Sequence, residues 1–426
     1  MEATTATLDS TLAPRPLPRD ERDPWPGFLR TMAWVGLNTF GGPVAQIGFM
    51  HRVAVEERRW LADGQFVHLL NFANVLPGPE ALEIAIHLGY LRRGILGGIA
   101  AGVLFIWPGF VALTALAWVY TSYGHVAGVA GFLDGVRPVA MALVAAAAIR
   151  ISRKVLKGRL SYVLMGAAFL ASYALGVPFV AILVACGALG LALGGRHRES
   201  KQADPRVHGW LFVVLVAGLV AGARLSSSGP APAARPERAE PAEGRREAPA
   251  AAPARLVDVA WVNTKAALVT FGGAYTVLPY LREQTVDRHG WLDDRQVVDG
   301  LALGETTPGP LICVGIFLSY LAAGFPGAVV GCFFLFLPSF VLVLGLGRYI
   351  DKVENLPRAR DVLWGFSAGT LGLIVALAAN LFPTSVPDPF AAAIGALAFA
   401  AVWRFDVNLV LVVLIGGGLG LVRAHA

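Results

Sequence analysis

Two turns with the same Pro-Gly-Pro sequence interrupt long apolar blocks of this chain. Residues 74–83 read NVLPGPEALE, and residues 305–314 read ETTPGPLICV. Each Pro-Gly-Pro removes two backbone donors and adds a flexible glycine, so a regular α-helix cannot run through it. About 20 apolar residues are needed to cross a bilayer. We therefore expect each of the blocks 64–91 and 296–320 to form two half-helices that meet near the middle of a membrane.

The two turns belong to an internal repeat. The Pro-Gly-Pro motifs at 77–79 and 308–310 are 231 positions apart (308 minus 77), and Thr-Phe-Gly-Gly at 39–42 recurs with the same offset at 270–273. From residue 39 to residue 79 this offset gives 14 identities in 41 ungapped positions, and past residue 90 the offset becomes 230. A register held over so many Gly, Pro and Trp positions indicates a duplicated chain.

Composition assigns the chain to the membrane proteins. It has 426 residues, of which 56% are hydrophobic and 15% charged, whereas soluble domains carry about 25% charged residues. We predict an all-α polytopic protein. Apolar blocks of membrane-spanning length predict about thirteen spans, near 27–50, 64–91, 94–120, 126–149, 160–175, 177–195, 207–224, 256–281, 296–320, 325–347, 361–382, 389–403 and 407–423.

The repeat and the spans divide the chain. We expect a polar N-terminal tail without a cleaved signal peptide, two six-span repeats, a connecting span, and a flexible linker rich in Pro, Ala, Glu and Arg. In order, these parts are residues 1–26 (tail), 27–206 (first repeat), 207–224 (connecting span), 225–255 (linker) and 256–426 (second repeat).

Basic residues predict that the two repeats are inserted in opposite orientations. The loops at 92–93 and 150–159 are rich in Arg and Lys, whereas the equivalent loops near 322 and at 383–389 carry none. Because cytoplasmic loops collect positive charge, the second repeat is expected to be inverted. The connecting span is the seventh, so an odd number of crossings precedes the second repeat. Loop 51–60 is basic in both repeats, as either a solvated loop or a vestibule that attracts anions.

Broken helices in matching positions of two repeats are the best sequence indication of a transport site. A half-helix that begins after Pro79 or Pro310 presents free amides and a positive dipole end to an anion. The Gly-Gly pairs either break their helices or allow close packing, and the threonines offer hydroxyls or bond their own backbone. The candidate substrate-binding residues are Gly41, Gly42, Pro77, Gly78, Pro79, Gly272, Gly273, Thr306, Thr307, Pro308, Gly309 and Pro310.

Ionisable residues inside spans are the next candidates, because their burial in a membrane is costly. Glu80, Glu83 and Glu305 flank the turns and either couple transport to protons or cap the half-helix amides. Lys265 either supplies a cation to the substrate or pairs with a glutamate. Asp134 and Arg137 are three residues apart, which predicts an ion pair on one helix face. We assign interface or packing roles to three histidines without ligand spacing, His51, His68 and His87.

Several classes of function are disfavoured. We find no nucleotide-binding loop, no metal-ligand cluster and no partnered nucleophile, so we expect no enzyme, no cofactor and no metal site. The three cysteines lie in apolar stretches and are interpreted as small apolar side chains. The net charge of +6 is interpreted as a determinant of orientation, and no nucleic-acid partner is expected. Energy for transport then comes from an ion or substrate gradient.

The motifs resemble those of the chromate ion transporter family. The first repeat carries FGGPVAQI at 40–47 and LPGPEA at 76–81, and the second carries FGGAYTVLP at 271–279 and ETTPGPL at 305–311, in the family's order. The chain resembles a long, two-domain member, and the resemblance covers most of its length. It adds to the candidate substrate-binding residues Phe40, Gln46 and Phe271.

The resemblance implies a multi-pass protein of the bacterial plasma membrane that exports chromate and confers chromate resistance. Sulfate is the natural competing dianion, and the proton is the candidate coupling ion. The sequence departs from the family at Leu82-Glu83, where Gln-Gln is expected, and this bears on substrate preference. A passive anion channel and a transporter of another oxyanion are the alternatives. The oligomeric state, including a homo-oligomer, is left open.

Overall fold

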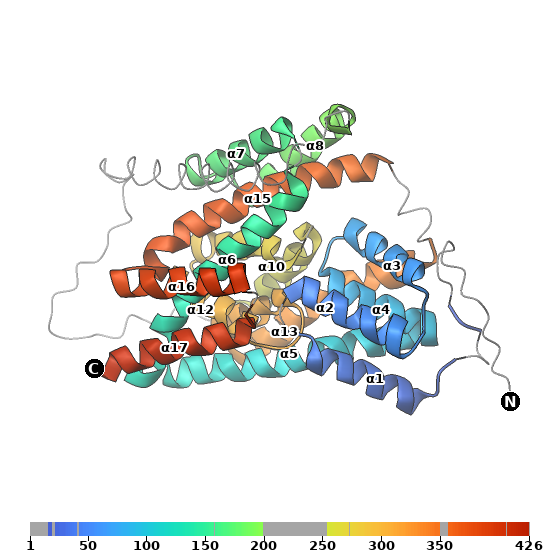
Figure 1. Ribbon diagram of the computed structural model, residues 1–426, viewed down its shortest axis with the longest axis horizontal. Coiled ribbons are helices and arrows are strands. Elements are labelled where there is room, and N and C mark those ends of the chain that lie inside the picture. Colours follow the sequence, from blue (N-terminus) through green and yellow to red (C-terminus); the bar gives the residue numbers. More distant parts are fainter. Residues whose placement is uncertain are drawn as a thin grey trace.

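The computed structural model describes residues 16–18, 22–40, 42–156, 158–198, 254–271, 273–349, 357–405 and 407–425. These residues form helices and no strand (Figure 1). The predicted connecting span at 207–224 lies outside them, and so does the predicted linker except for its last two residues.

The first repeat begins with short helices and ends with longer ones. Its elements are α1 (Trp25–Asn38), α2 (Gly42–His51), η2 (Arg52–Glu57), α3 (Asp63–Val75), α4 (Glu80–Arg93), α5 (Ile95–Tyr123), α6 (Ala127–Val155), α7 (Arg159–Tyr173) and α8 (Phe179–Arg198).

The second repeat has the same order of elements. They are α10 (Leu256–Val269), η3 (Ala274–Val277), α11 (Leu278–Arg282), η4 (Glu283–Arg288), α12 (Asp294–Glu305), η5 (Leu311–Cys313), α13 (Val314–Leu346), η6 (Gly347–Tyr349), α15 (Pro357–Ser385), α16 (Pro389–Phe405) and α17 (Leu409–His425).

The predicted breaks at Pro-Gly-Pro are confirmed. Helix α3 ends at Val75 and α4 begins at Glu80, while α12 ends at Glu305 and η5 begins at Leu311. The segment that follows each break then turns back on itself at a glycine with positive φ. This glycine is Gly94 (φ 72°) between α4 and α5, and Gly324 (φ 65°) inside α13. Helix α13 therefore corresponds to α4 and α5 together.

The Gly-Gly motifs also interrupt helices. The predicted spans 27–50 and 256–281 are each divided near their middle, because α1 ends at Asn38 and α10 ends at Val269. Gly42 and Gly273 have φ of 81° and 119°, which favours glycine, and a Cβ added to either would meet nothing within 4 Å. At these two positions the motif serves the turn, and the close-packing alternative is not observed. Gly41 and Gly272 lie outside the described residues.

Four helices of the described part are long and apolar enough to cross a membrane. They are Ile95–Tyr123, Ala127–Val155, Leu311–Leu346 and Arg360–Ser385. Large apolar side chains on α5 and α13 stay exposed, as in Trp107 (58%) and Phe333 (58%). Such a surface is suited to lipid. The chain is thus consistent with a polytopic membrane protein, and the count of thirteen spans remains a prediction.

Equivalent helices of the two repeats run in opposite directions. A Cβ on Gly98 would lie 2.6 Å from Leu344, whereas one on Gly102 would lie 2.5 Å from Phe340, so residue numbers rise along α5 as they fall along α13. The paired surfaces also line one apolar groove with equivalent side chains, Val103 with Phe333 among them. An approximate twofold axis therefore relates the two repeats.

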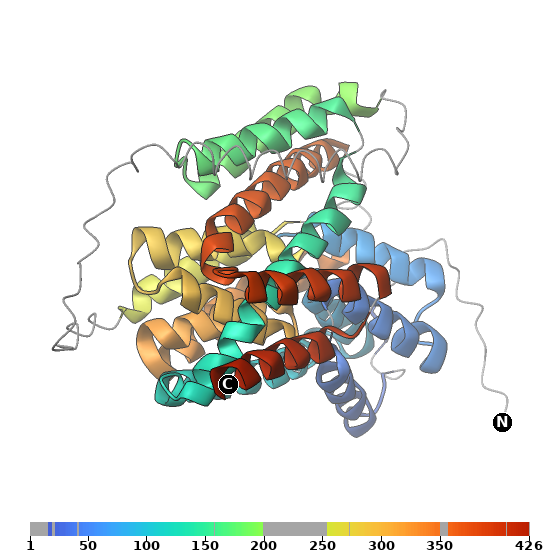
Figure 2. The ribbon, with the colours of Figure 1, turned by 60° about the vertical axis from the view of Figure 1, so that its left-hand side comes forward.

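Each repeat packs its last two helices on the other repeat. Helices α7 and α8 lie on α15, and α16 and α17 lie on α6 (Figures 1 and 2). The contacts are close and equivalent. A Cβ on Gly135 would lie 2.1 Å from the carbonyl oxygen of Gly416, and one on Gly365 would lie 2.1 Å from that of Cys186. Glycine permits this approach of helix backbones. The two repeats thus exchange their last two helices and share one core.

Candidate functional site

The two Pro-Gly-Pro turns meet the Thr-Phe-Gly-Gly segments of the opposite repeats. The amide of Gly78 donates a hydrogen bond to the carbonyl of Thr270 (2.9 Å), and the amide of Gly309 donates to the carbonyl of Thr39 (3.0 Å). These bonds are equivalent under the 231-residue offset. Each turn is therefore held by the other half of the chain. We call this pair of interlocked segments, residues 76–80 with 270–271 and 307–311 with 39–40, the crossed turns.

Glycine is required at the centre of each crossed turn. Gly78 has φ of 145° and Gly309 has φ of 101°. A Cβ on Gly78 would lie 2.4 Å from the Ser339 hydroxyl and 2.5 Å from a carboxyl oxygen of Glu83. The corresponding Cβ on Gly309 would approach Gly109 no closer than 3.6 Å. The first turn is thus the more crowded of the two.

Gln46 makes the crossed turns asymmetric. Its side-chain amide donates to the carbonyl of Gly309 at 2.6 Å, and the residue is 2% exposed. Its amide oxygen is buried and has no hydrogen-bond partner in the described part of the chain. The equivalent residue of the second repeat is Val277, which cannot make this bond. One turn is therefore supported by a side chain and the other is not.

The two half-helices start differently after the turns. Helix α4 begins directly at Glu80, and its N-cap residue Pro79 provides no side-chain cap. The first amides of an α-helix have no partner within the helix, so this end can attract an anion. In the second repeat, η5 forms one 3₁₀ turn before α13 starts at Val314. The predicted half-helix end is present in full only in the first repeat.

The three candidate carboxylates occupy different surroundings. Glu83 is 1% exposed, and neither carboxyl oxygen has a hydrogen-bond partner among the described residues. Capping of amides by Glu83 is thus not observed. Glu305 is 3% exposed and accepts a hydrogen bond from the hydroxyl of Tyr275. Glu80 lies half-buried at the first position of α4.

Two basic residues of α6 act on this region. The guanidinium of Arg150 exerts an electrostatic effect on Glu305 and Tyr275, and the ammonium of Lys154 does so on Glu80. Sequence reasoning assigned both to a loop, because the apolar block stops at residue 149. The helix continues to Val155 and so includes both residues, which are exposed. Helical continuation past an apolar block was the missed signal.

Other candidates do not join the site in this structure. The hydroxyls of Thr306 and Thr307 donate to backbone carbonyls of α12, at 2.8 and 3.0 Å, so the backbone alternative is the one observed. Lys265 lies with its ammonium 4.7 Å from the ring centre of Trp261, and its charge acts on His289. Within the described residues no ion pair with a glutamate is found for this lysine.

The aromatic residues of the Gly-Gly motifs have different exposure. Phe40 is 39% exposed, whereas Phe271 packs on Phe366 with a centroid distance of 4.8 Å. Phe271 therefore contacts α15. Tyr275 lies within the motif at 271–279, and nothing in the sequence marks it as a partner of Glu305. Its contact with Glu305 depends on how the second break folds.

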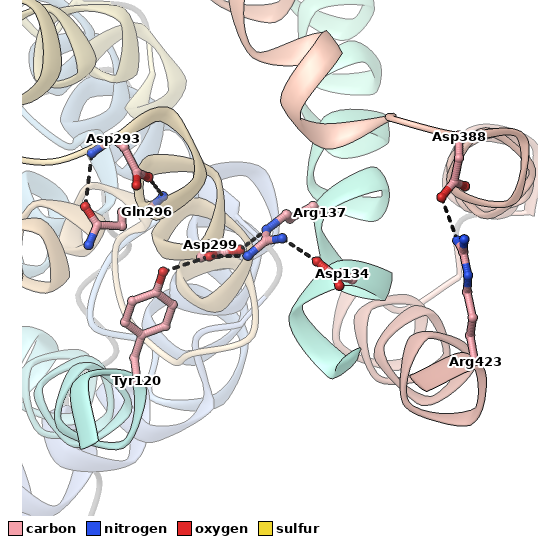
Figure 3. Close-up of polar contacts among 8 residues, drawn as sticks. All are labelled: Tyr120, Asp134, Arg137, Asp293, Gln296, Asp299, Asp388 and Arg423. Atoms are coloured by element: carbon pink, nitrogen blue, oxygen red, sulfur yellow. Dashed lines mark hydrogen bonds and ion pairs between the residues drawn. The ribbon is translucent and has the colours of Figure 1, made fainter. Parts of the chain in front are cut away.

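Asp134 and Arg137 belong to a larger network (Figure 3). Arg137 bonds Asp134 as its spacing predicts, and it also holds Asp299 of α12 with two hydrogen bonds of 2.7 and 3.0 Å. The hydroxyl of Tyr120 donates to the same carboxylate at 3.0 Å. Asp299 is fully buried. The network fastens the second broken helix to α5 and α6, and its guanidinium is largely engaged by protein carboxylates.

The basic loops are internally paired. His51 contacts Asp63 at 2.7 Å, and the equivalent Arg282 contacts Asp294 at 2.8 Å. In each repeat this side-chain contact ties the loop to the helix that follows it. In the second loop, the carboxylate of Glu283 accepts a hydrogen bond from the amide of Phe179 at 2.6 Å. Burial raises the pKa of Glu283 above its usual value. These pairs favour a structural role for His51 and Arg282.

No group of His, Cys, Asp and Glu residues in the described part of the chain could hold a metal ion. The chemistry available at the crossed turns is accordingly that of backbone amides, hydroxyls, carboxylates and basic side chains. Amides at a helix end suit an oxyanion, and buried carboxylates suit a transferable proton.

The exchanged helices and the interlocked broken segments define a class, the polytopic membrane proteins built from two repeats around a shared site. Comparison with known proteins then supplies the family. The chromate transporter family model matches residues 27–191 and 257–421, one match for each repeat. This chain belongs to the chromate transporter family, which is a family of transporters and not of enzymes.

Named relatives agree with this assignment. The chain is 36% identical to the chromate transport protein of Pseudomonas aeruginosa over 425 residues, covering 98% of this chain and 94% of that one. It is 29% identical to the chromate transport protein of Cupriavidus metallidurans, covering 89% and 86%. It is 27% identical to the probable chromate transport protein of Synechococcus elongatus, covering 88% and 89%. No solved structure matches.

Proposed function

We propose that this protein is a secondary transporter that exports chromate across the bacterial inner membrane and so confers chromate resistance. The family and the named relatives support the substrate. Export and the location in the inner membrane rest on the sequence resemblance. Sulfate, a tetrahedral dianion of similar shape, is proposed as a competitor.

The observation that carries the proposal is the interlocking of the crossed turns. Each broken helix is bonded through its central glycine to the opposite repeat. A ligand held there touches both halves, so a movement of one half against the other changes the access to it from either side. The opposite directions of α5 and α13 fit such a movement, in which the two repeats exchange conformations. We propose that the repeats are inserted with inverted topology.

Electrostatics support an anionic substrate. The positive end of the α4 dipole attracts an oxyanion, and of the first amides of α4 those of Leu82 and Glu83 already bond the carbonyl of Pro79. Arg150 and Lys154 of α6 add positive charge that acts on Glu305 and Glu80. Three carboxylates oppose it while they are ionised, namely Glu80, Glu83 and Glu305. We propose that proton binding to at least one of them is coupled to anion movement, because neutralisation would remove the repulsion.

Two alternatives are distinguished by measurement. A passive channel would conduct the anion without any coupling, and the buried carboxylates of the site disfavour it. A different oxyanion is the second alternative, favoured by Leu82-Glu83 next to the first turn, where the family motif is expected to carry Gln-Gln. A buried acidic side chain there alters the charge that the substrate meets.

The deciding experiment is chromate uptake into everted membrane vesicles from cells that express the protein. Uptake is measured with and without excess sulfate, and with and without an imposed pH gradient. Vesicles with Pro79→Ala and Pro310→Ala, matched for protein content, serve as site variants. The proposal predicts uptake that sulfate inhibits and the pH gradient drives, with reduced rates in at least one variant.

The other outcomes are equally informative. Chromate uptake that is insensitive to any gradient would identify a passive channel. No uptake of chromate, in vesicles shown to contain the protein, would favour the second alternative and direct the assay to other oxyanions. Unaltered transport in both proline variants would remove the crossed turns from the mechanism.

A further inference from the structure

Helix α4 buries two ionisable side chains that form no hydrogen bond of good geometry within the described residues, although the Ser339 hydroxyl lies near Glu83. Glu83 and His87 are each 1% exposed. Among the described residues, neither oxygen of the carboxyl group and neither nitrogen of the imidazole has a hydrogen-bond partner. Burying such groups unpaired is costly, and the rare cases in proteins need an explanation. The two residues are four positions apart and therefore lie on one face of the helix.

This face continues to the end of the helix. Tyr90 follows His87 by three residues, and their ring centroids are 6.1 Å apart. Beyond it, α4 ends with Arg92 and Arg93, and Arg92 forms an ion pair with Asp23 at 2.7 Å. In the other direction Glu83 lies beside Gly78, at the first crossed turn. Three groups able to carry a proton thus lie in a row from the crossed turns toward a charged end of the helix.

The surroundings of the row are otherwise mostly apolar. Helix α4 packs against α2, α3, α5 and α13. The described groups that face Glu83 and His87 from other elements are Phe72 of α3 (5.3 Å between ring centroids), Ser339 of α13 and Gly347 of η6. The charged group that acts on Glu83 is Glu80 of the same helix, and Lys154 of α6 acts in turn on Glu80. No charged side chain is placed against the imidazole by the contacts of the described residues.

Glu83 and His87 have no equivalents in the second repeat, whereas Tyr90 recurs as Tyr320. The one-residue change of offset lies between residues 79 and 90, so Glu83 corresponds to Cys313 or Val314, and His87 corresponds to Phe317 or Leu318. These residues of η5 and α13 are buried. Because the backbone is duplicated and these side chains are not, packing of the repeat does not require them. A function confined to the first repeat explains them better.

We propose that Glu83, His87 and Tyr90 form a proton path along one face of α4, between the crossed turns and the end of the helix that carries Arg92 and Arg93. This deepens the proposed function and rests on it, because it names the residues that couple protons to the anion. When the oxyanion binds, the Glu83 carboxylate takes up a proton and becomes a carboxylic acid, which removes its repulsion of the anion. His87 accepts a proton on one ring nitrogen and releases one from the other, so the imidazole is neutral before and after.

The proton returns by the reverse steps when the anion leaves. The 6.1 Å between the rings of His87 and Tyr90 leaves a gap that side-chain rotation or one bridging water can close. No atom is consumed and no other reactant is needed. His87 is in this account a relay that does not touch the oxyanion, so its removal should affect proton movement and spare anion exchange.

The test uses the full-length protein in liposomes that contain a pH-sensitive dye. Two quantities are measured with chromate, which are counterflow exchange at equal pH and proton flux during net chromate movement. For His87→Gln we expect a fall in proton flux and in pH-driven accumulation of roughly tenfold or more, with counterflow unchanged. His68→Gln, the same change on the neighbouring helix α3, is the matched control and should leave both quantities unchanged.

Each result has one reading. Normal proton flux in His87→Gln would overturn the path. If that variant does not fold, Tyr90→Phe decides, because it removes only a hydroxyl, and an unchanged proton flux would then be the contrary result. Wild-type protein that exchanges chromate but moves no protons would overturn the path and leave the proposed transport standing. Wild-type protein without chromate exchange would overturn the proposed function itself.

Discussion

At the crossed turns, a nearly symmetric backbone carries side chains that differ between the repeats. Gly78 and Gly309 each bond a threonine carbonyl of the opposite half, whereas Gln46, Glu83 and Glu305 have no like residue at the equivalent positions. The backbone provides two exchangeable halves, and the side chains give a direction to the chemistry. Differences between equivalent positions are therefore the best guide to coupling and substrate choice.

The first prediction concerns the two central glycines. Gly78→Ala places a Cβ within 2.5 Å of Ser339 and Glu83, besides a strained φ, whereas Gly309→Ala meets nothing closer than 3.6 Å. Strain of this kind costs about 1–3 kcal/mol, and the clash adds to it. We expect Gly78→Ala to lose more chromate uptake in everted vesicles than Gly309→Ala does. Gly166→Ala on α7, where a Cβ has open space, is the control; equal uptake in all three variants would contradict the role of the turns.

The second prediction concerns the buried ion pair of Arg137. Asp299 is fully buried, so Asp299→Asn leaves a mostly buried guanidinium without its bidentate partner. Breaking such a pair costs about 3–5 kcal/mol, and we expect a clear drop in the melting temperature of the detergent-solubilised protein. Arg423→Gln breaks the more exposed pair with Asp388 (2.7 Å) and should have a much smaller effect. Similar melting temperatures for both variants would argue against a structural role for the network.

At the residue level the sequence predicted positions better than partners. The breaks at Pro-Gly-Pro follow from missing donors, and the pairing of Asp134 with Arg137 follows from helix spacing. The third member, Asp299, could not be found in this way, because it comes from a helix 162 positions away and has His68 as its equivalent. The structure places Lys265 beside Trp261, and its role in substrate binding stays a prediction. Its depth in an apolar block is visible in the sequence, but the side of the helix that it occupies depends on packing.

At the scale of elements, charge distribution and helix direction give the same arrangement from independent observations. Arg and Lys gather in opposite loops of the two repeats, and α5 and α13 run antiparallel where they pack. The exchange of terminal helices was not predicted. Apolar helices such as α8 and α17 carry little information about which neighbour they cover, since nearly all their faces are apolar.

The third prediction tests orientation at this scale. Single cysteines replace Arg159, the first residue of α7, and Pro387, before α16, in a chain whose three natural cysteines are changed to alanine. Both positions are exposed. Inverted insertion predicts that a membrane-impermeant maleimide labels one of them from outside the cell and the other only in everted vesicles. Labelling of both from the same face would contradict inverted topology, and labelling in detergent confirms that each site is reactive.

At the scale of the whole molecule, neither repeat is complete without the other. The long helices α6 and α15 are covered by the terminal helices of the opposite repeat, and each crossed turn borrows its acceptor from the other half. Loss of one half would expose glycine-lined helix surfaces and free the central amides. Stability and site geometry therefore depend on the same contacts.

The fourth prediction follows from this dependence. Residues 1–240 and 241–426, expressed together as separate chains cut inside the predicted linker, should copurify and retain chromate uptake, since the described contacts do not require the linker. Either half expressed alone should be degraded or aggregate. As a control, a chain cut between α15 and α16 should assemble better than one with Gly135→Leu, because the leucine side chain blocks the approach of α17. Stable, active single halves would contradict the prediction.

The exchanged hydrogen bonds of Gly78 and Gly309 also constrain how such a protein could have evolved. An ancestor with a single repeat would have had no acceptor for its central amide within its own chain. It would have needed a second copy facing the opposite way in the same membrane, made either by one gene product that inserted in both directions or by two diverging genes. Fusion into one reading frame then fixed the stoichiometry at one to one and freed each copy to specialise. On this view the carboxylate and imidazole found only on α4 are later acquisitions, made possible once the two copies no longer had to be identical.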